Sequence, residues 1–477
     1  MLRLEWPAAA DTSTLNVTTI ETPGLGDRSY VADADGWAVA VDVQRDLDRV
    51  EDVLQRRGAR LGAVLETHIH NDYLSGGWAL ARRFGARYVV PSYAPVSFRA
   101  ESADPREPID IGPLRLRAIP APGHTDTHTA YSLHVEDRPA DAAFTGGSLL
   151  LGGTGRTDLL GSERAEELAR EQYWTVRRLA RLLPGSARLL PTHGFGSFCM
   201  AGPALEEGGE TLADQLTVNP AYLLDEDAFV ADLLRRSGPV PAYFAEMGER
   251  NLAGTVAADL GTPPRLTAAT VQQMAAAGCW VLDVRPRSDY AKAHLPGTVS
   301  IDARGPIATW AGWTVPLDEP VVLVAADEQQ LAAAQRELSR IGVDHVAGAH
   351  VGPLRTAAAA LTTEDFGGLA AALGTGRSVD VLDVRETSEW HTGHLRGARH
   401  VPAHELDDLT TAVTRSAEPS WLYCASGFRA TVAGTLLSRQ GIDVVVLDDD
   451  VALAAAVGVP WCAGQHCPAD RCVHAQT

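Results

Sequence analysis

The chain has 477 residues, of which 45% are hydrophobic, and a chain of this length is expected to form about three globular domains. Its 41 Lys and Arg residues against 61 Asp and Glu residues give a net charge of −20, which argues against binding to nucleic acid or to an anionic membrane. The N-terminal residues lack the apolar core of a signal peptide, and no run approaches the roughly 18 apolar residues that would span a bilayer. We therefore expect a cytoplasmic protein.

The first half of the chain alternates short apolar strands with helical stretches. Residues 31–43 predict a pair of strands around a turn, and further strands are expected at 61–65, 88–90 and 114–119. Helical spacing of apolar residues is found at 46–57 and 165–183. This mixture predicts an α/β sandwich whose functional residues lie at strand ends, where open α/β folds place their ligands.

Polar motifs follow several of these strands. The first, ETHIHNDY at residues 66–73, comes directly after the buried strand 61–65. Alternate residues of an extended backbone point the same way, so His68 and His70 can face one metal ion and Asp72 extends that face. The later motifs are PGHT at 122–125, TGGS at 145–148 and PTHG at 191–194.

The second half of the chain contains a tandem duplication. The motif VLDVR at 281–285 recurs at 381–385, and HLPG at 294–297 is matched by HLRG at 394–397, both at an offset of 100 residues. Each copy predicts a small doubly wound α/β domain. With loosely composed linkers near 254–267 and 357–376, the expected domains are 1–257, 262–358 and 364–461, followed by a cysteine-containing tail at 462–477.

Cys424 is the candidate nucleophile of the second copy. It lies between a predicted strand that ends at Tyr423 and a helix that begins near Ala430, so backbone N–H groups and the positive end of the helix favour its thiolate. Arg429 adds a permanent positive charge to the same loop. The residues between them would bind the substrate: Ala425, Ser426, Gly427 and Phe428. An inert buried cysteine is the alternative, but such cysteines do not usually come with this loop.

The second copy resembles the rhodaneses, a family of sulfurtransferases. The resemblance lies in the LDVR strand, in Glu389 and Trp390, in GHLRGA at 393–398 and in the six-residue loop from Cys424 to Arg429. Related phosphatases have a loop one residue longer. The resemblance implies that Cys424 carries a persulfide and exchanges sulfur with thiosulfate or sulfite. The first copy has Val324 or Ala325 in place of the cysteine, so we expect an inactive domain that serves as spacer and docking surface.

The four motifs of the first domain, in this order, resemble the metallo-β-lactamase superfamily, whose fold is an αββα sandwich. FTGGS at 144–148, GRTD at 155–158 and VNP at 218–220 resemble its persulfide dioxygenase branch, and the fusion to two rhodanese domains resembles known dioxygenase–sulfurtransferase fusions. The resemblance implies oxidation of a low-molecular-weight thiol persulfide by O₂, giving sulfite and the free thiol. It implies one divalent metal ion, Fe(II) in preference to Zn, held by two histidines and a carboxylate.

The sequence departs from that family at three positions. His68 and His124 match the family's histidine ligands, but Gly147 stands at the position of the carboxylate, and Tyr73 replaces a histidine of the hydrolytic members. A two-metal hydrolysis of thioesters is therefore the least favoured chemistry. Thr154 stands where the dioxygenases often have a cysteine.

A one-metal site remains possible with an altered ligand set. His68, His70 and His124 could form a three-histidine set for iron or zinc, or Asp72 could supply the carboxylate. His193 matches the last histidine of the superfamily's site, and His128 is expected to be an ordinary loop histidine. If the metal lies where the family places it, Gly147→Asp should raise the affinity for iron.

Three functions remain open at this stage. The first is a bifunctional persulfide dioxygenase and sulfurtransferase, the second a sulfurtransferase whose metallo-domain is degenerate, and the third a protein that only stores or senses persulfide at Cys424. The six cysteines form no disulfide framework, so we expect an exposed tail in which Cys462, Cys467 and Cys472 are reduced. We also expect a homo-oligomer.

Overall fold

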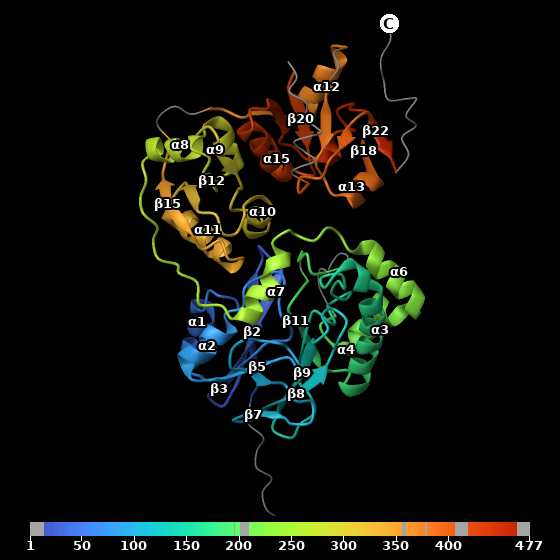
Figure 1. Ribbon diagram of the computed structural model, residues 1–477. Coiled ribbons are helices and arrows are strands. Elements are labelled where there is room, and N and C mark those ends of the chain that lie inside the picture. Colours follow the sequence, from blue (N-terminus) through green and yellow to red (C-terminus); the bar gives the residue numbers. More distant parts are fainter. Residues whose placement is uncertain are drawn as a thin grey trace, which may run out of the picture. The chain divides into compact units, whose positions relative to one another are not determined.

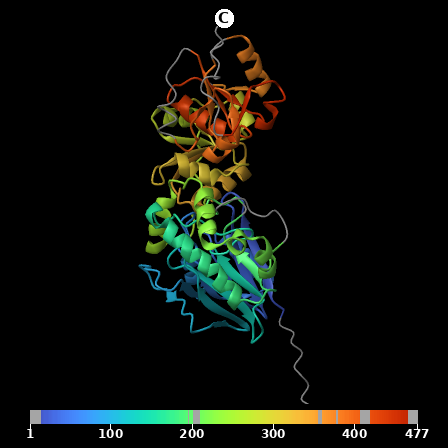
Figure 2. The same ribbon diagram turned by 90° about the vertical axis from the view of Figure 1, so that its right-hand side faces the viewer.

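The computed structural model describes residues 14–194, 196–200, 209–354, 359–376, 379–405 and 418–464. The chain divides into two compact units, Met1–Val240 with Phe244–Ala258, and Pro241–Tyr243 with Asp259–Thr477 (Figure 1, Figure 2). Among the described residues, no helix is both long enough and apolar enough to cross a membrane. Cys467 and Cys472 of the predicted tail lie outside the described residues.

The first unit contains two sheets. The first sheet has the strand order β1 (Asn16–Thr22), β2 (Asp27–Ala34), β3 (Trp37–Val41), β4 (Arg60–Leu65), β5 (Arg87–Val90) and β6 (Glu101–Ser102). The second has the order β11 (Arg188–Pro191), β10 (Ala142–Gly146), β9 (Thr129–Val135), β8 (Leu114–Pro120) and β7 (Ile109–Ile111). The predicted pair of strands at 31–43 is the hairpin of β2 and β3.

Alternating side chains place this unit's core on both faces of the first sheet. In β3, Val39 and Val41 pack between the two sheets, whereas Ala38 and Ala40 face the apolar sides of α1 and α2. On the outer face of the second sheet, α3 packs with α4 and α6. The predicted αββα sandwich is therefore confirmed. Its helices are α1 (Asp48–Arg57), α2 (Gly77–Phe84), α3 (Ala165–Leu182), α4 (Leu212–Val218), α5 (Pro220–Leu223), α6 (Glu226–Arg236) and α7 (Phe244–Ala253), with a 3-10 turn at Ser162–Arg164.

The second unit contains two parallel sheets. The first copy has the order β13 (Val299–Ser300), β12 (Trp280–Asp283), β14 (Val321–Ala325) and β15 (Val346–Val351). Its helices are α8 (Ala268–Ala276), α9 (Arg287–Lys292), α10 (Ile307–Thr314) and α11 (Glu328–Arg340). All pairings in this sheet are parallel, as a doubly wound domain requires.

The second copy repeats this plan. Its sheet has the order β16 (Thr362–Glu364), β21 (Val444–Leu447), β20 (Ser420–Tyr423), β17 (Val381–Asp383) and β19 (Arg399–His400). A separate antiparallel pair consists of β18 (Gly393–Leu395) and β22 (Trp461–Ala463). The helices are α12 (Phe366–Gly374), α13 (Thr387–Thr392) and α15 (Phe428–Arg439), with a 3-10 turn at Val451–Leu453. Cys462 in β22 is buried and disulfide-bonded, so the expectation that it is a reduced thiol in an exposed tail is wrong.

Candidate metal centre and sulfur-transfer site

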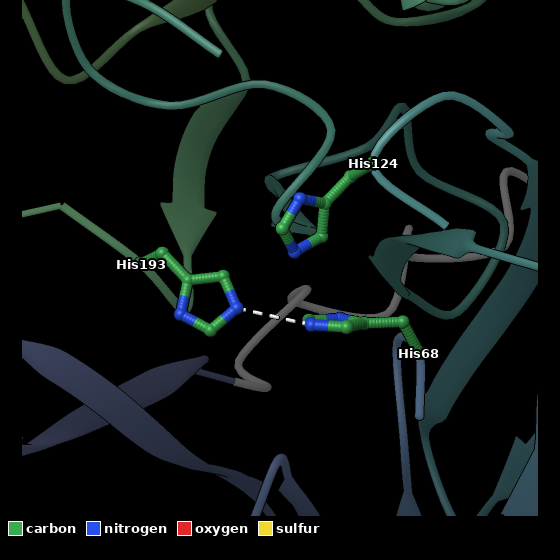
Figure 3. A group of neighbouring side chains, drawn as sticks. All are labelled: His68, His124 and His193. Carbon is green, nitrogen blue, oxygen red and sulfur yellow. Dashed lines mark hydrogen bonds between the residues drawn. The ribbon is translucent and has the colours of Figure 1, made fainter. Parts of the chain in front are cut away.

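Three buried histidines meet where strands of both sheets end. His68 follows β4, His124 follows β8 and His193 follows β11, and one ring nitrogen of each lies within 4.8 Å of the others (Figure 3). All three side chains are at most 1% exposed. The set contains His193 where the sequence predicted His70. Buried imidazoles that converge in this way are a common arrangement of metal ligands.

Hydrogen bonds fix which nitrogen of His68 carries the proton. The hydroxyl of Thr67 donates to Asp42 Oδ2 at 2.7 Å, so Thr67 Oγ1 accepts from Nδ1–H of His68 at 2.9 Å. The proton is then on Nδ1, and Nε2 presents a lone pair to the centre of the cluster. In many metal sites a residue such as Thr67 hydrogen-bonds to the ring nitrogen that faces away from the metal, and this bond orients the histidine and fixes its tautomer.

The other two histidines are held in the same way. His124 Nδ1 lies 2.7 Å from the carbonyl oxygen of Arg156, which can only accept, and His124 Nε2 is buried without a hydrogen-bond partner. His193 Nδ1 lies 2.9 Å from Asp27 Oδ1, and its Nε2 lies 3.0 Å from Nε2 of His68. All three Nε2 atoms are therefore directed at one another, and those of His68 and His124 present lone pairs to the centre of the cluster.

The three rings of the cluster differ in their protonation. Burial and the neighbouring histidines lower the pKa of His68, and burial and His193 lower that of His124 to about 3, so both rings are neutral ligands. Burial alone would lower the pKa of His193, but Asp72 and Asp27 outweigh it and raise the pKa to about 10. A metal ion bound at Nε2 of His193 competes with that proton.

His70 is held at Nε2, whereas the three clustered histidines are held at Nδ1. Its Nε2–H donates to Glu66 Oε2 at 3.1 Å and lies 3.0 Å from the hydroxyl of Tyr73, while its Nδ1 has no hydrogen-bond partner. His70, Asp72 and His193 form a second set of converging ligand atoms. The structure thus brings all five candidate metal ligands into two sets that share His193; their role as ligands stays a prediction.

Position 147 has no room for the carboxylate that the metallo-β-lactamase superfamily is expected to have there. A Cβ atom at position 147 would lie 2.2 Å from Cδ2 of His124. The N–H of Gly147 donates instead to Nε2 of His128 at 3.0 Å. His128 is a buried loop residue that stacks on His68 with 5.0 Å between ring centroids, and among the described residues it belongs to none of the sets of converging ligand atoms. The hydroxyl of Tyr73 lies 3.0 Å from Nε2 of His70.

These contacts reverse the expectation for Gly147→Asp. Because the added side chain would collide with the ring of His124, we expect the variant to lose stability by about 1–3 kcal/mol and to bind less iron, not more. Thermal unfolding and iron content of the purified protein measure both effects. Gly147→Ala adds the Cβ atom without the carboxylate and should behave similarly. A rise in iron affinity for Gly147→Asp alone would show that the ring of His124 gives way.

The sequence did not single out the residues that orient the histidines. Asp27 lies at the start of β2, Asp42 directly follows β3, and Thr67 stands within the first histidine motif. A polar residue at the end of a buried strand was the available signal for Asp42. Arg156 and Asp158 form an ion pair, with 2.6 Å between Nε and Oδ1.

Cys424 lies in a tight loop between β20 and α15. Its side chain is 1% exposed, and the loop turns at Gly427, whose φ of +88° is a left-handed conformation that favours glycine. The carbonyl of Ala425 accepts from the N–H of Val451 at 3.0 Å. This is the predicted strand, loop and helix arrangement around the cysteine.

Arg429 is paired rather than free. Its Nη1 and Nη2 both donate to Glu389, the second at 2.8 Å. Burial alone would raise the pKa of Glu389, but Arg429 outweighs it and lowers the pKa. A catalytic role of Arg429 stays a prediction, and its partner Glu389 belongs to the motif on which the rhodanese resemblance rests.

The sheet register settles which residue replaces the cysteine in the first copy. Asp283 pairs with Val324, as Asp383 pairs with Tyr423 in the second copy. Ala325 therefore occupies the position of Cys424, and the first copy has a methyl group in place of the thiol. The repeated LDVR motif has a structural role in both copies, because Arg285 binds Asp283 and Arg385 binds Asp383.

Two protein families match separate parts of the chain. The model of the rhodanese-like domain matches residues 267–350 and 367–452, and that of the metallo-beta-lactamase superfamily matches residues 36–193. The chain combines a metallo-β-lactamase domain with two rhodanese-like domains. The histidine cluster lies in the metallo-β-lactamase domain and Cys424 in the second rhodanese-like domain. Because Cys424 is the predicted nucleophile and the first copy lacks this cysteine, the second and first copies are called the catalytic and the inactive rhodanese domain below.

Known relatives match part of the chain. The mitochondrial persulfide dioxygenase ETHE1 of Homo sapiens is 28% identical over 221 residues, 46% of this chain and 77% of the relative. The hydroxyacylglutathione hydrolase of Acidiphilium cryptum is 35% identical over 118 residues, 24% of this chain and 48% of the relative. The structure of a metallo-beta-lactamase from Staphylococcus aureus subsp. aureus COL shows the same fold, with a TM-score of 0.63 and 23% identity over 71% of this chain and 99% of that chain. Together these findings place the chain among enzymes of sulfur metabolism.

Proposed function

We propose that the chain is a bifunctional enzyme. The metallo-β-lactamase domain oxidises a low-molecular-weight thiol persulfide with O₂ and water to sulfite and the free thiol, and the catalytic rhodanese domain transfers sulfane sulfur through Cys424. The observation that carries the first activity is the convergence of three Nε2 atoms on one buried point, with Nδ1 of each ring held by a hydrogen bond. The persulfide dioxygenase relatives support the choice of reaction.

The residues present fit one divalent metal ion. His68, His124 and His193 would hold it, and three imidazoles suit Fe(II) as well as Zn, with Fe(II) favoured for O₂ chemistry. When bound, the iron supplies a place where O₂ and the persulfide sulfur meet. Thr67, the carbonyl of Arg156 and Asp27 hold the ring protons on the outer nitrogens, and burial of the cluster excludes water.

The sulfur transfer at Cys424 complements this reaction. The thiolate of Cys424 attacks the outer sulfur of thiosulfate, a new S–S bond forms, and sulfite leaves with the electron pair of the broken bond. In reverse, sulfite made by the first domain accepts the sulfur of the Cys424 persulfide and gives thiosulfate. For this reverse direction the thiolate of Cys424 first attacks the outer sulfur of the thiol persulfide, a new S–S bond forms, and the free thiol leaves with the electron pair of the broken bond. The direction of transfer, the subunit number and the domain boundaries stay predictions.

Thioester hydrolysis by a two-metal site is disfavoured by two features of the site. The ring of His124 fills the space that a bridging carboxylate at 147 would need, and Tyr73 supplies a hydrogen-bonded hydroxyl in place of a histidine. The remaining alternatives are a sulfurtransferase with a degenerate metallo-β-lactamase domain and a protein that only stores or senses persulfide at Cys424.

Metal analysis coupled to a measurement of O₂ uptake distinguishes these proposed functions. We expect the purified protein to hold about one iron per chain and to consume O₂ when a thiol persulfide is added. Iron-free protein that cannot be reconstituted, or iron-loaded protein without O₂ uptake, would leave only the sulfurtransferase. Hydrolysis of a glutathione thioester without O₂ uptake would instead favour the hydrolase.

Thr67→Val tests the hydrogen bonding around the metal. The variant keeps the shape of the side chain but removes the acceptor for Nδ1–H of His68, so its iron affinity should fall by about 10- to 100-fold, as for other outer partners of metal ligands. Competition with a chelator measures this affinity. Thr175→Val is the control, because that hydroxyl is also buried but donates to the carbonyl of Pro122. Equal losses in both variants would contradict the role of Thr67.

A further inference from the structure

A side chain of the inactive rhodanese domain reaches the loop that follows Cys424. Arg287, at the start of α9, donates from Nη2 to the carbonyl oxygen of Ser426 at 3.0 Å. Its Nε donates to Oδ1 of Asp448 at 2.7 Å. Ser426 lies in the loop after β20, and Asp448 directly follows β21, so one guanidinium joins two separate segments of the catalytic domain.

Asp448 in turn lies directly against the turn of the loop. A Cβ atom at Gly427 would lie 2.1 Å from Oδ1 of Asp448, the same oxygen that Arg287 binds. Gly427 therefore has both a left-handed backbone and a neighbouring carboxylate that leaves no space for a side chain. Arg287 thus binds the carboxylate that lies against this turn.

The contact with Ser426 constrains the backbone of the loop. A peptide unit is planar and trans, so its C=O and its N–H point in opposite directions. When Arg287 fixes the carbonyl of Ser426, it also fixes the direction of the N–H of Gly427. Loop N–H groups of this kind stabilise negative charge on sulfur, so their direction bears on the thiolate and persulfide of Cys424.

Aromatic contacts continue the same interface. The ring of Phe428 packs on Gly305 of the inactive domain, where a Cβ atom would lie 2.4 Å from Cε2 of that ring. Trp310 of α10 lies edge-on to Phe428, with 6.2 Å between ring centroids. Further along α15, Arg439 donates to carbonyls of the inactive domain, Gly278 at 2.7 Å among them. The inactive domain thus contacts α15 at its beginning and near its end.

We propose that Arg287 is a positioning residue for sulfur transfer and that the inactive rhodanese domain is a working part of the site at Cys424. This inference rests on the proposed sulfur transfer. It replaces the expectation that the first copy is only a spacer and docking surface. Thr387 stands at the equivalent position of the second copy, so the two copies differ at this position and only the first has an arginine there.

Arg287→Gln in the full-length protein tests the proposal. The variant should lower kcat for sulfur transfer from thiosulfate to cyanide by about 10- to 100-fold, the scale of a misplacement near 1 Å, with little change in KM. Arg287→Lys should recover only part of the rate, because an ammonium group lacks the planar fork that binds Ser426 and Asp448 together.

The matched control is Arg439→Gln, which also removes an arginine between the two copies but lies far along α15 from the loop. The rate of alkylation of Cys424, followed by mass spectrometry of its peptide, gives a second readout that does not depend on turnover. We expect Arg287→Gln to shift this rate and Arg439→Gln to leave it unchanged.

The outcomes are distinguishable. Equal losses of kcat in both variants, or wild-type kcat and alkylation rates in Arg287→Gln, would overturn the positioning role. If the wild-type protein transfers no sulfur, the proposed function of Cys424 fails; the alkylation rates then still decide whether Arg287 sets the loop.

Discussion

Cys424→Ser should abolish sulfur transfer from thiosulfate to cyanide. The serine is nearly isosteric with cysteine, but its hydroxyl is not ionised near neutral pH and cannot carry a sulfane sulfur. The rate should fall by at least about 10³-fold. Other enzymes lose more than this when their nucleophile is replaced, so the figure is a lower bound. Formation of thiocyanate measures this rate directly. O₂ uptake with a thiol persulfide should stay at the wild-type level, because the histidine cluster belongs to the other unit.

Cys279→Ser is the matched control for this variant. Cys279 is also a free thiol of the second unit, but it precedes β12 of the first copy and takes no part in the loop. We expect the Cys279→Ser variant to transfer sulfur at the wild-type rate. Wild-type transfer by Cys424→Ser would reject the assignment of the nucleophile, and loss of both activities together would show that the two sites are coupled.

His124→Ala should remove the metal and with it the O₂ uptake. This ring supplies a buried Nε2 atom without any partner in the protein, so its loss deletes a ligand rather than a neighbour of one. We expect iron affinity to fall by more than the roughly 10- to 100-fold that a change in an outer partner causes. Iron content after dialysis and O₂ uptake with a thiol persulfide are the two measurements. Sulfur transfer at Cys424 should persist.

His134→Ala separates the loss of a ligand from the loss of any histidine of the domain. His134 lies in β9 and bonds to Ser132 and to the carbonyl of Arg138, away from the cluster. It should retain iron. If His124→Ala binds iron as the wild type does, the three-histidine site is refuted. If it loses iron but keeps O₂ uptake, the oxidation takes place elsewhere.

Sequence patterns predicted the parts of this protein that depend on local order. The strand-like stretches at 31–43 and 61–65 and the helical spacing at 165–183 predicted an α/β sandwich, and the 100-residue offset of the LDVR motif predicted the duplication. The loop at Cys424 was recognisable because strand, cysteine and helix are adjacent in the chain. In each case, the residues that determine the structure lie within one short segment.

Contacts between distant segments could not be predicted in this way. His193 lies in the same ligand set as His68 although 125 residues separate them, because β4 and β11 belong to different sheets that meet at this edge. The contact of Arg287 with Ser426 likewise spans 139 residues. Position 147 needed the structure too, since only the ring of His124 shows why a glycine is required there.

Asp42 has a consequence for the stability of the domain. This buried residue has a φ of +53°, and its carboxylate accepts from the backbone N–H of Thr67, after β4 of one sheet, and from the hydroxyl of Thr192, after β11 of the other. The same carboxylate that sets the tautomer of His68 therefore fastens the two sheets together. A metal ion that binds only the folded domain adds to the free energy of unfolding of that domain. Here the ion would bind beside the contact that joins the two sheets. Loss of metal and separation of the sheets should then be a single cooperative event.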